Sequence, residues 1–199
     1  AYTPGVADVV KSISEHAENA YKYTAKANLV AVVSNGTAIL GLGDQGALAS
    51  KPVMEGKAIL FKRFADIDSI DLEIDSSNAN EIVNCITALS KSFGGINLED
   101  IAAPDCFIIE QKLREKLDIP IFHDDQHGTA IITLAALINA SDISKKSLKN
   151  IKVVVNGAGA SAIACTNLFK SSGVPNKNIV MLDRKGVLYR GRENLDQWK

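Results

Sequence analysis

The sequence predicts an α/β protein made of two units, residues 1–140 and residues 141–199. Short apolar runs rich in β-branched residues alternate with segments of helical periodicity, which is the pattern of sheets covered by helices. Two of these runs end in acidic pairs, Glu99-Asp100 and Asp124-Asp125. A later apolar run leads through a glycine-rich turn into a helical segment. Together these observations predict parallel strands whose carboxyl ends carry the functional groups.

The composition is that of an ordinary globular chain, with 199 residues, 46% hydrophobic, 23% charged and a net charge of -1. The near-zero net charge gives no electrostatic basis for binding nucleic acid or an anionic membrane. No apolar run approaches the ~20 residues of a membrane span, and no signal peptide is visible. The three cysteines are widely spaced and lack a CxxC motif. We therefore expect a cytoplasmic protein with reduced cysteines and neither a nucleic-acid nor a membrane partner.

The two ends of the chain lead us to expect further residues beyond both of them. The chain begins with Ala1 instead of methionine, and it stops at Lys199 after one strand-helix-strand unit. One such unit does not cover both faces of a parallel sheet.

The first part of the chain is predicted as a Pro/Gly loop (residues 1–6) followed by a helix over residues 7–23. Residues 29–33 have the β-branched composition of a strand. The Asn35-Gly36 pair that follows is typical of a hairpin turn, so residues 38–43 are expected to form the return strand.

Residues 44–57 are predicted as a small-residue loop and a short helix, after which Lys57 opens an apolar run. A lysine beside an apolar run usually extends its amine to water. Alternatively, burial lowers the pKa of this lysine, so that it accepts a proton near neutral pH. Tyr2, taken alone, is expected to be a packing residue.

The middle of the chain is predicted to form alternating strands and helices. Residues 66–75 alternate acidic and apolar side chains, as in a half-buried strand with solvated acids. An amphipathic helix is expected over residues 79–90 and another helix over 105–117. The runs 93–100 and 119–122 are expected to be strands that end in acidic residues.

The two acidic pairs are the strongest candidates for a metal site. Both follow predicted parallel strands, so their carboxylates are expected to lie side by side. Such an oxygen-rich cluster suits Mg2+ or Mn2+. His123 and His127 flank the second pair. They are open as ligands, hydrogen-bond partners or caps, although Mg2+ prefers oxygen.

The second unit is predicted to begin a Rossmann-type dinucleotide-binding domain. Gly128-Thr129 is expected to start a helix over residues 130–140, and the polar residues 141–150 are expected to be a linker. An apolar strand over 151–155 and a helix over 163–170 then flank a GxGxxA motif. The residues predicted to bind the cofactor are Asn156, Gly157, Ala158, Gly159, Ala160 and Ser161.

The end of the next strand, residues 179–182, bears on the choice of dinucleotide. Asp183 follows it directly and would accept the ribose hydroxyls of NAD. Arg184 and Lys185 come next and could instead hold the 2′-phosphate of NADP. The preference is therefore open, with NAD favoured by Asp183.

Taken together, these motifs resemble those of bacterial malic enzymes over essentially the whole chain. The resemblance rests on several segments in the same order, which are residues 2–6, 35–43, 56–57, 95–100, 122–129 and 156–160.

The resemblance implies oxidative decarboxylation of (S)-malate to pyruvate and CO2, with NAD or NADP and with Mg2+ or Mn2+. It implies that Glu99, Asp100 and Asp125 bind the metal. Lys57 would be the base that takes the hydroxyl proton, and Tyr2 would be the acid that protonates the enolpyruvate carbon. A nearby cation would help to lower the pKa of the lysine.

The resemblance also implies a homodimer or larger assembly, in which the tyrosine segment serves the neighbouring subunit's site. Asp124 would orient groups beside the metal. One departure concerns Ala38, because larger animal-type enzymes carry a substrate-binding arginine at this position. The second carboxylate of malate must then be held by other groups.

Two other functions are weighed against this one. A dehydrogenase of the same two-domain plan that acts on an amino acid or a folate needs no carboxylate cluster. A catalytically silent module that senses a dinucleotide or metabolite has no use for a buried lysine beside a metal site. The first alternative therefore leaves the acidic pairs unexplained, and the second leaves Lys57 unexplained.

Overall fold

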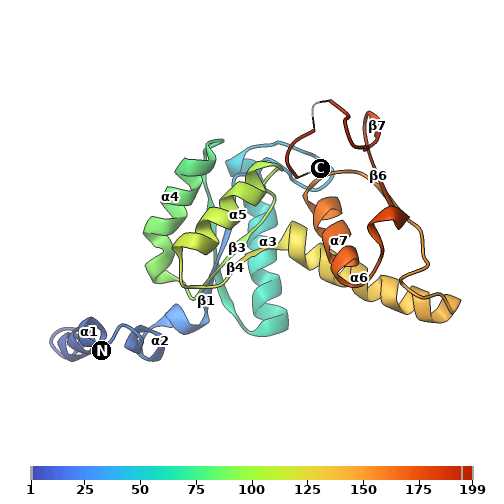
Figure 1. Ribbon diagram of the computed structural model, residues 1–199. Helices are drawn as coiled ribbons and strands as arrows, with labels where there is room; N and C mark the ends of the chain where they lie inside the picture. The colour runs from blue at the N-terminus through green and yellow to red at the C-terminus, as the bar shows by residue number, and fades with distance from the viewer. Residues whose placement is uncertain (1, 194, 199) are drawn as a thin grey trace.

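The computed structural model describes residues 2–193 and 195–198, which form an N-terminal arm and two sheets with their helices (Figure 1). This arrangement confirms the predicted α/β class. Among the described residues, no helix has both the length and the apolar character needed to cross a bilayer.

The first sheet has four parallel strands, and helices cover both of its faces (Figure 1). Helix α3 packs against β1 and β2, whereas α4 and α5 lie on the opposite face. In spatial order the strands are β2 (Asp68–Glu73), β1 (Leu29–Ser34), β3 (Gly95–Leu98) and β4 (Ile121–His123). The helices are α3 (Ala47–Ala65), α4 (Ala79–Leu89), the 3-10 turn η2 (Ser90–Ser92) and α5 (Asp105–Lys116).

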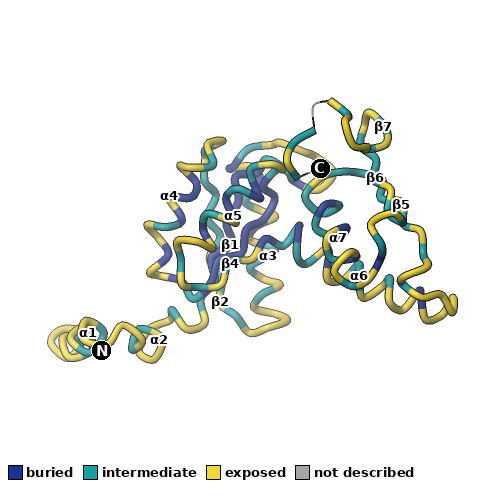
Figure 2. The backbone as a smooth tube through the Cα atoms, in the orientation of Figure 1, coloured by how far each residue is buried: buried dark blue, intermediate teal, exposed yellow. Residues whose placement is uncertain are grey.

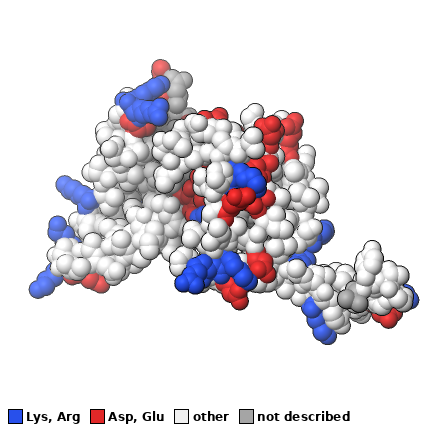
Figure 3. Space-filling model, turned by 180° about the vertical axis from the view of Figure 1, so that it is seen from behind, with Lys and Arg blue, Asp and Glu red and all other residues white. Residues whose placement is uncertain are grey.

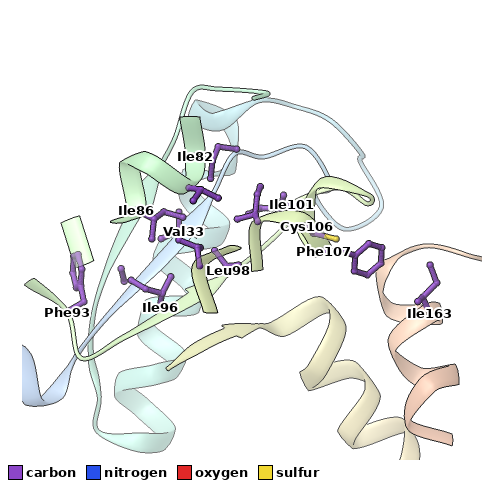
Figure 4. Packing of buried hydrophobic residues seen from close by; sticks show 14 residues of the cluster. Val33, Ile82, Ile86, Phe93, Ile96, Leu98, Ile101, Cys106, Phe107 and Ile163 are labelled. Atoms are coloured by element: carbon purple, nitrogen blue, oxygen red, sulfur yellow. The ribbon is translucent and has the colours of Figure 1, made fainter. Parts of the chain in front are cut away.

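The main hydrophobic core lies between this sheet and α4 and α5 (Figure 4). Val33 and Leu98 from the two central strands are fully buried, and they meet Ile82 and Ile86 of α4. Figure 2 shows the same pattern, with buried backbone concentrated in the central strands. The main core therefore lies beside the strands that end at the acidic pairs.

The second sheet contains the predicted strand-helix-strand unit. Parallel strands β5 (Val153–Asn156) and β6 (Ile179–Asp183) are joined through α7 (Ala160–Ser171) and the 3-10 turn η3 (Asn176–Asn178). A short strand, β7 (Gly186–Val187), pairs antiparallel with β6 and was not predicted.

Helix α6 (Asp124–Ser144) joins the two sheets. It begins directly after β4 and packs along α7 (Figure 1). Ala130 of α6 is buried in one cluster with Cys165 and Phe169 of α7. The carboxylates at the start of α6 are thereby fixed relative to the second sheet.

The N-terminal arm projects away from both sheets (Figure 1). It consists of α1 (Val6–Glu15), α2 (Asn19–Tyr23) and the 3-10 turn η1 (Ala25–Asn28), and none of these elements contains a buried residue (Figure 2). The single helix predicted over residues 7–23 is wrong. The chain is extended at His16, and the Asn19 side chain donates to Ser12 Oγ at 2.8 Å, so local polar contacts replace the continuous helix.

The predicted hairpin after β1 is also wrong. Both edges of β1 are occupied by parallel neighbours, β2 and β3, so no edge is left for a return strand. Residues 37–46 form a loop instead, with one isolated bridge between Ile39 and Gly43. Gly36 has a φ of +69°, and a Cβ atom there would lie 2.1 Å from the carbonyl oxygen of Gly46. The absence of a side chain at Gly36 therefore allows the two ends of this loop to approach each other.

Two helices extend beyond their predicted limits. Lys57 lies inside α3, not after a short helix. Helix α6 begins at Asp124, four residues before Gly128, because acids in a first helical turn interact favourably with the helix dipole. The same helix continues to Ser144, so the first residues of the predicted linker are helical. The division into domains at residue 140 stays a prediction.

Candidate active site

Three carboxylates gather where β3 ends and α6 begins. Glu99 and Asp100 directly follow β3, and Asp125 lies in the first turn of α6. Each offers an oxygen within 4.8 Å of the oxygens of the other two. The backbone N–H of Asp100, whose φ is 52°, donates to Asp125 Oδ2 at 2.9 Å. The structure thus brings together the three residues predicted as metal ligands, in an oxygen-rich group that suits a hard divalent cation.

The electrostatics of this carboxylate triad favour a bound cation. Burial raises the pKa of Glu99 to about 7, and the charges of Asp124 and Asp125 contribute to the rise. Burial also raises the pKa of Asp100 to about 6, followed by the effect of Asp125. Buried like charges resist ionisation unless a counter-charge is present. A divalent cation would supply that counter-charge, so the triad fits such an ion.

Lys57 reaches this triad from α3. Its Nζ atom lies 2.8 Å from Asp124 Oδ2 and 3.2 Å from Glu99 Oε2. Burial pulls the pKa of Lys57 down, but the hydrogen bond to Asp124 and the charge of Glu99 outweigh it, so the pKa is raised. Burial acts in the expected direction, but the net pKa of Lys57 is raised, not lowered. A lysine in contact with two carboxylates is stabilised in its charged form.

Two residues that support the site were missed from the sequence. Asn97 Nδ2 donates to Glu99 Oε2 at 2.9 Å, and a Cβ atom at Gly128 would lie 2.3 Å from Asp124 Oδ1. The sequence contains a signal for Asn97. It is polar within an otherwise apolar strand, and alternate residues of a strand share a face, which places it beside Glu99. The sequence pattern indicates Gly128 only as a helix start.

The two histidines near the triad lie outside the group of potential ligands that the described residues form. His123 is fully buried, and neither ring nitrogen has a hydrogen-bond partner in the described part of the chain. His127 Nε2 lies 2.5 Å from Glu110 Oε1, and Gln126 donates to the other oxygen of Glu110 at 3.2 Å. Of the three roles left open for His127, which are ligand, hydrogen-bond partner and cap, the structure shows the hydrogen-bond partner.

A cavity of about 410 Å³ connects the triad with the glycine-rich loop. Asp100 and Asp125 line one side, and residues 158–161 line another. Ala38 and Leu40 also line it, from the loop that follows β1. A substrate in this cavity would therefore touch both the carboxylates and the loop.

The glycine-rich loop has the geometry expected for a pyrophosphate. Gly157 has a φ of +128° and donates its N–H to Leu182 O at 2.9 Å, which ties the start of the loop to the end of β6. No atom lies within 4 Å of a Cβ position at Gly157 or Gly159. Helix α7 starts without a side-chain cap at Gly159, so its first N–H groups face an open approach for an anion.

Asp183 ends β6 beside this loop, because Leu182 pairs with Asn156 in the sheet. Its two carboxylate oxygens each lie 2.7 Å from Nη2 of Arg192, a residue that no sequence motif indicated. Arg184 is exposed next to it. The acid predicted to receive a ribose is thus already paired.

Tyr2 is the predicted site residue that the structure does not bring to the others. It is 82% exposed, and its carbonyl oxygen accepts the N–H of Val6 at the start of α1, the helix on the arm that projects away from both sheets (Figure 1). Convergence of Tyr2 and Lys57 within one chain is therefore not observed.

Comparisons with known proteins agree on one family. Two family models match, "Malic enzyme, N-terminal domain" over residues 1–82 and "Malic enzyme, NAD binding domain" over residues 126–199. The chain is 64% identical to an NADP-dependent malic enzyme and 56% identical to an NAD-dependent malic enzyme, both from Rhizobium meliloti (strain 1021). In each case 100% of this chain aligns with 26% of the relative, about a quarter of its length.

Comparison with solved structures identifies the same family. The crystal structure of an NAD-dependent malic enzyme from Thermotoga maritima has a TM-score of 0.92 and 50% sequence identity. The match covers 96% of this chain and 50% of that one.

Proposed function

Because the chain belongs to the malic enzyme family, we propose that the full-length protein converts (S)-malate to pyruvate and CO2. The reaction reduces NAD+ or NADP+ and requires Mg2+ or Mn2+. The observation that carries this proposal is the contact of Lys57 with Glu99, at 3.2 Å, beside a carboxylate triad that opens toward the glycine-rich loop. This reaction uses an amine, a metal-binding cluster and a dinucleotide loop, and the structure places these three beside one another.

Glu99, Asp100 and Asp125 would hold the divalent cation. When bound, the cation supplies a Lewis acid that polarises the substrate's oxygen atoms. Asn97 keeps the Glu99 carboxylate oriented through its 2.9 Å hydrogen bond, and the Asp100 N–H does the same for Asp125. The protein thus fixes the ligand oxygens before substrate binds.

Lys57 would take the hydroxyl proton of malate as the hydride leaves for the nicotinamide. For this step its amine must be neutral, whereas Asp124 and Glu99 favour the ammonium form. The charge of a cation held at Glu99 would offset that carboxylate and lower the pKa of Lys57 toward the working range. Asp124, at 2.8 Å, would then stabilise the ammonium group that forms.

Tyr2 would protonate the enolpyruvate carbon in the site of a neighbouring subunit. Its exposure on a projecting arm supports a role outside its own chain. The assembly proposed is therefore a homodimer or a larger homo-oligomer, as in closed symmetric assemblies generally.

The proposed setting is the cytoplasm, without a nucleic-acid or membrane partner. Cys85, Cys106 and Cys165 are all free, which supports a reducing compartment. The dinucleotide would bind at residues 156–161, with its pyrophosphate at the start of α7.

The proposal is tested by initial rates of dinucleotide reduction with malate and Mn2+ in the full-length protein. Formation of NADH or NADPH together with pyruvate supports it. A protein that binds Mn2+ and dinucleotide but produces neither would instead be a catalytically silent sensor. No observation on the site favours that second reading, because it leaves the contact between Lys57 and Glu99 without a use.

A further inference from the structure

Glu110 of α5 is a carboxylate buried inside the protein. Figure 3 shows the more usual location of Asp and Glu side chains, at the surface and in several places beside Lys or Arg. Glu110 is 6% exposed instead, and both of its oxygens are engaged. Oε2 accepts a hydrogen bond from Gln126 Nε2 at 3.2 Å, and Oε1 lies 2.5 Å from His127 Nε2. Burying a carboxylate is costly unless hydrogen-bond donors compensate it, so these two contacts offset the burial of Glu110.

The contact with Glu110 also fixes the ring of His127. An ionised carboxylate accepts hydrogen bonds and cannot donate them, so Nε2 of His127 carries the proton in this contact. The ring further packs against Phe122 of β4, with the two ring centroids 5.6 Å apart. The imidazole is therefore held between β4 and α5.

The two partners of Glu110 lie in the first turn of α6, directly after Asp125. No side-chain hydrogen bond caps the start of this helix. Asp124 Oδ2 accepts a hydrogen bond from Lys57 of α3. Asp125 Oδ2 accepts one from the backbone N–H of Asp100. The next two residues of the helix both contact Glu110, which thus ties this turn to α5.

Helix α5 is itself connected to the other half of the carboxylate triad, because a short loop leads into it from Asp100. Ile101 in this loop and Leu113 in the helix are fully buried in the main core. Helix α5 therefore cannot move relative to β3 without disturbing close-packed side chains. Glu110 links this well-anchored helix to the turn that carries Asp125.

We propose that Glu110 is a positioning residue for the metal site, and that it acts through the two residues after Asp125 to set where this ligand meets the other two carboxylates. The inference rests on the metal binding of the proposed function. A divalent cation requires its ligand atoms within about 0.2 Å of their ideal distances. Groups that orient metal ligands typically contribute about 10- to 100-fold in metal affinity.

The test is the affinity of the full-length protein for Mn2+ alone, measured by calorimetry without substrate. Two variants separate the reach of the Glu110 side chain from its charge. Glu110→Gln keeps the length, and its amide accepts from His127 and donates to the amide oxygen of a flipped Gln126, so the affinity should stay close to that of the wild type. Glu110→Asp keeps the charge but is one methylene shorter, so it loses at least one of the two contacts and should weaken Mn2+ binding about tenfold.

The reverse order of the two variants would overturn the inference, because it would mean that Glu110 acts on the cation through its charge. Wild-type affinity in Glu110→Asp would overturn it as well, because Asp125 would then be placed without this support.

Two further variants of α5 control for general loosening of the helix. Leu113→Ala leaves a cavity in the main core, so it should lower the melting temperature but leave the Mn2+ affinity of the folded protein unchanged. Glu115→Ala removes a carboxylate from the exposed side of α5, where Glu115 accepts a hydrogen bond from Gln111 at 2.9 Å. It should change neither property. Equal losses of Mn2+ affinity in Leu113→Ala and Glu110→Asp would reduce the effect to destabilisation and overturn the inference.

The electron paramagnetic resonance spectrum of bound Mn2+ gives a second readout, because it depends on the geometry of the ligands. At saturating Mn2+, the spectrum of Glu110→Asp should differ from that of the wild type, whereas Leu113→Ala and Glu110→Gln should match it. A wild-type spectrum in Glu110→Asp would mean that the ligands have not moved, and this would count against the inference.

Failure of this inference is distinguishable from failure of the proposed function. A wild type that binds Mn2+ but reduces no dinucleotide with malate would contradict the proposed function alone. Malate-dependent reduction together with unchanged Mn2+ affinity in Glu110→Asp would contradict the role of Glu110 alone. A wild type that does not bind Mn2+ would overturn both.

Discussion

Gly128 and Asp124 share one turn of α6, and the glycine leaves the space that the aspartate carboxylate occupies. A Cβ atom at Gly128 would lie 2.3 Å from Asp124 Oδ1, while Asp124 Oδ2 accepts a hydrogen bond from Lys57 at 2.8 Å. The glycine thus permits the contact that positions the amine of Lys57.

Gly128→Ala is therefore expected to lower kcat while the protein stays folded. The alanine displaces the Asp124 carboxylate and misplaces Lys57, which can cost up to about a hundredfold in rate. Helix propensity works the other way, since alanine favours a helix interior by about 1 kcal/mol over glycine. Steady-state rates and thermal melting measure the two effects separately.

A double-mutant cycle provides the control for this prediction. In an Asp124→Ala background the clash no longer exists, so Gly128→Ala should cause little further loss of kcat. Additive losses would mean that the glycine acts through something other than Asp124.

Lys57→Ala is expected to abolish dinucleotide reduction while metal binding stays nearly intact. The variant removes the proposed base but none of the three carboxylates of the triad. Rates with malate and a Mn2+ titration followed by calorimetry measure the two properties. Lys62→Ala, an exposed lysine of the same helix that pairs with Asp66 and Asp68, is the matched control and should keep full activity. Near-normal turnover by Lys57→Ala would exclude this lysine as the base.

Asp125→Ala is expected to raise the Mn2+ requirement sharply, because the variant removes one of three oxygen ligands. It also removes the acceptor of the Asp100 N–H, which loosens the chain after β3. The concentration of Mn2+ that gives half-maximal rate measures the effect, and Asp118→Ala, at an exposed position, is the control. An unchanged Mn2+ titration would remove Asp125 from the ligand set.

The metal-free protein is expected to lose stability as the pH rises through the titration range of Glu99 and Asp100. Folding raises the pKa of Glu99 from 4.5 to about 7 and that of Asp100 from 3.8 to about 6. A raised carboxyl pKa contributes stability that is full below the unfolded pKa and lost as the pH passes the folded pKa.

Thermal melting in EDTA at pH 5 and at about pH 8 measures this loss. Glu99→Gln does not titrate, so its melting temperature should fall less over the same interval. Added Mn2+ should stabilise the wild type more at the higher pH, since protons and metal compete for the same oxygens. Equal slopes for wild type and variant would contradict the raised pKa of Glu99.

Tyr2→Phe and Lys57→Ala are expected to complement each other when the two inactive proteins are mixed and allowed to exchange subunits. If Tyr2 serves the neighbouring subunit, a mixed dimer has one site with both residues intact. Random exchange in a dimer would then restore about a quarter of the wild-type activity. A mixture that stays inactive after proven exchange would place Tyr2 in the site of its own chain.

Much of the fold follows from patterns that are local in the sequence. Apolar runs bounded by turn residues predicted β1, β3 and β6, and helical periodicity predicted α4 and α5, all of which the structure confirms. The predicted hairpin failed because the sequence does not reveal that both edges of β1 are already paired. The prediction of a single N-terminal helix failed because the backbone is extended at His16 and the Asn19 side chain bonds to Ser12.

The sequence by itself determined the inventory of the site: two acidic pairs after parallel strands, a lysine in an apolar segment and a glycine-rich turn before a helix. These are local features, because the end of a strand and the start of a helix are encoded by neighbouring residues. Only the tertiary structure decided which groups meet. Lys57 faces carboxylates from two other elements, which reverses the expected direction of its pKa shift, and Arg192 occupies Asp183. Such contacts depend on how the elements pack, because charges interact through space over a few ångströms whatever their separation in the chain.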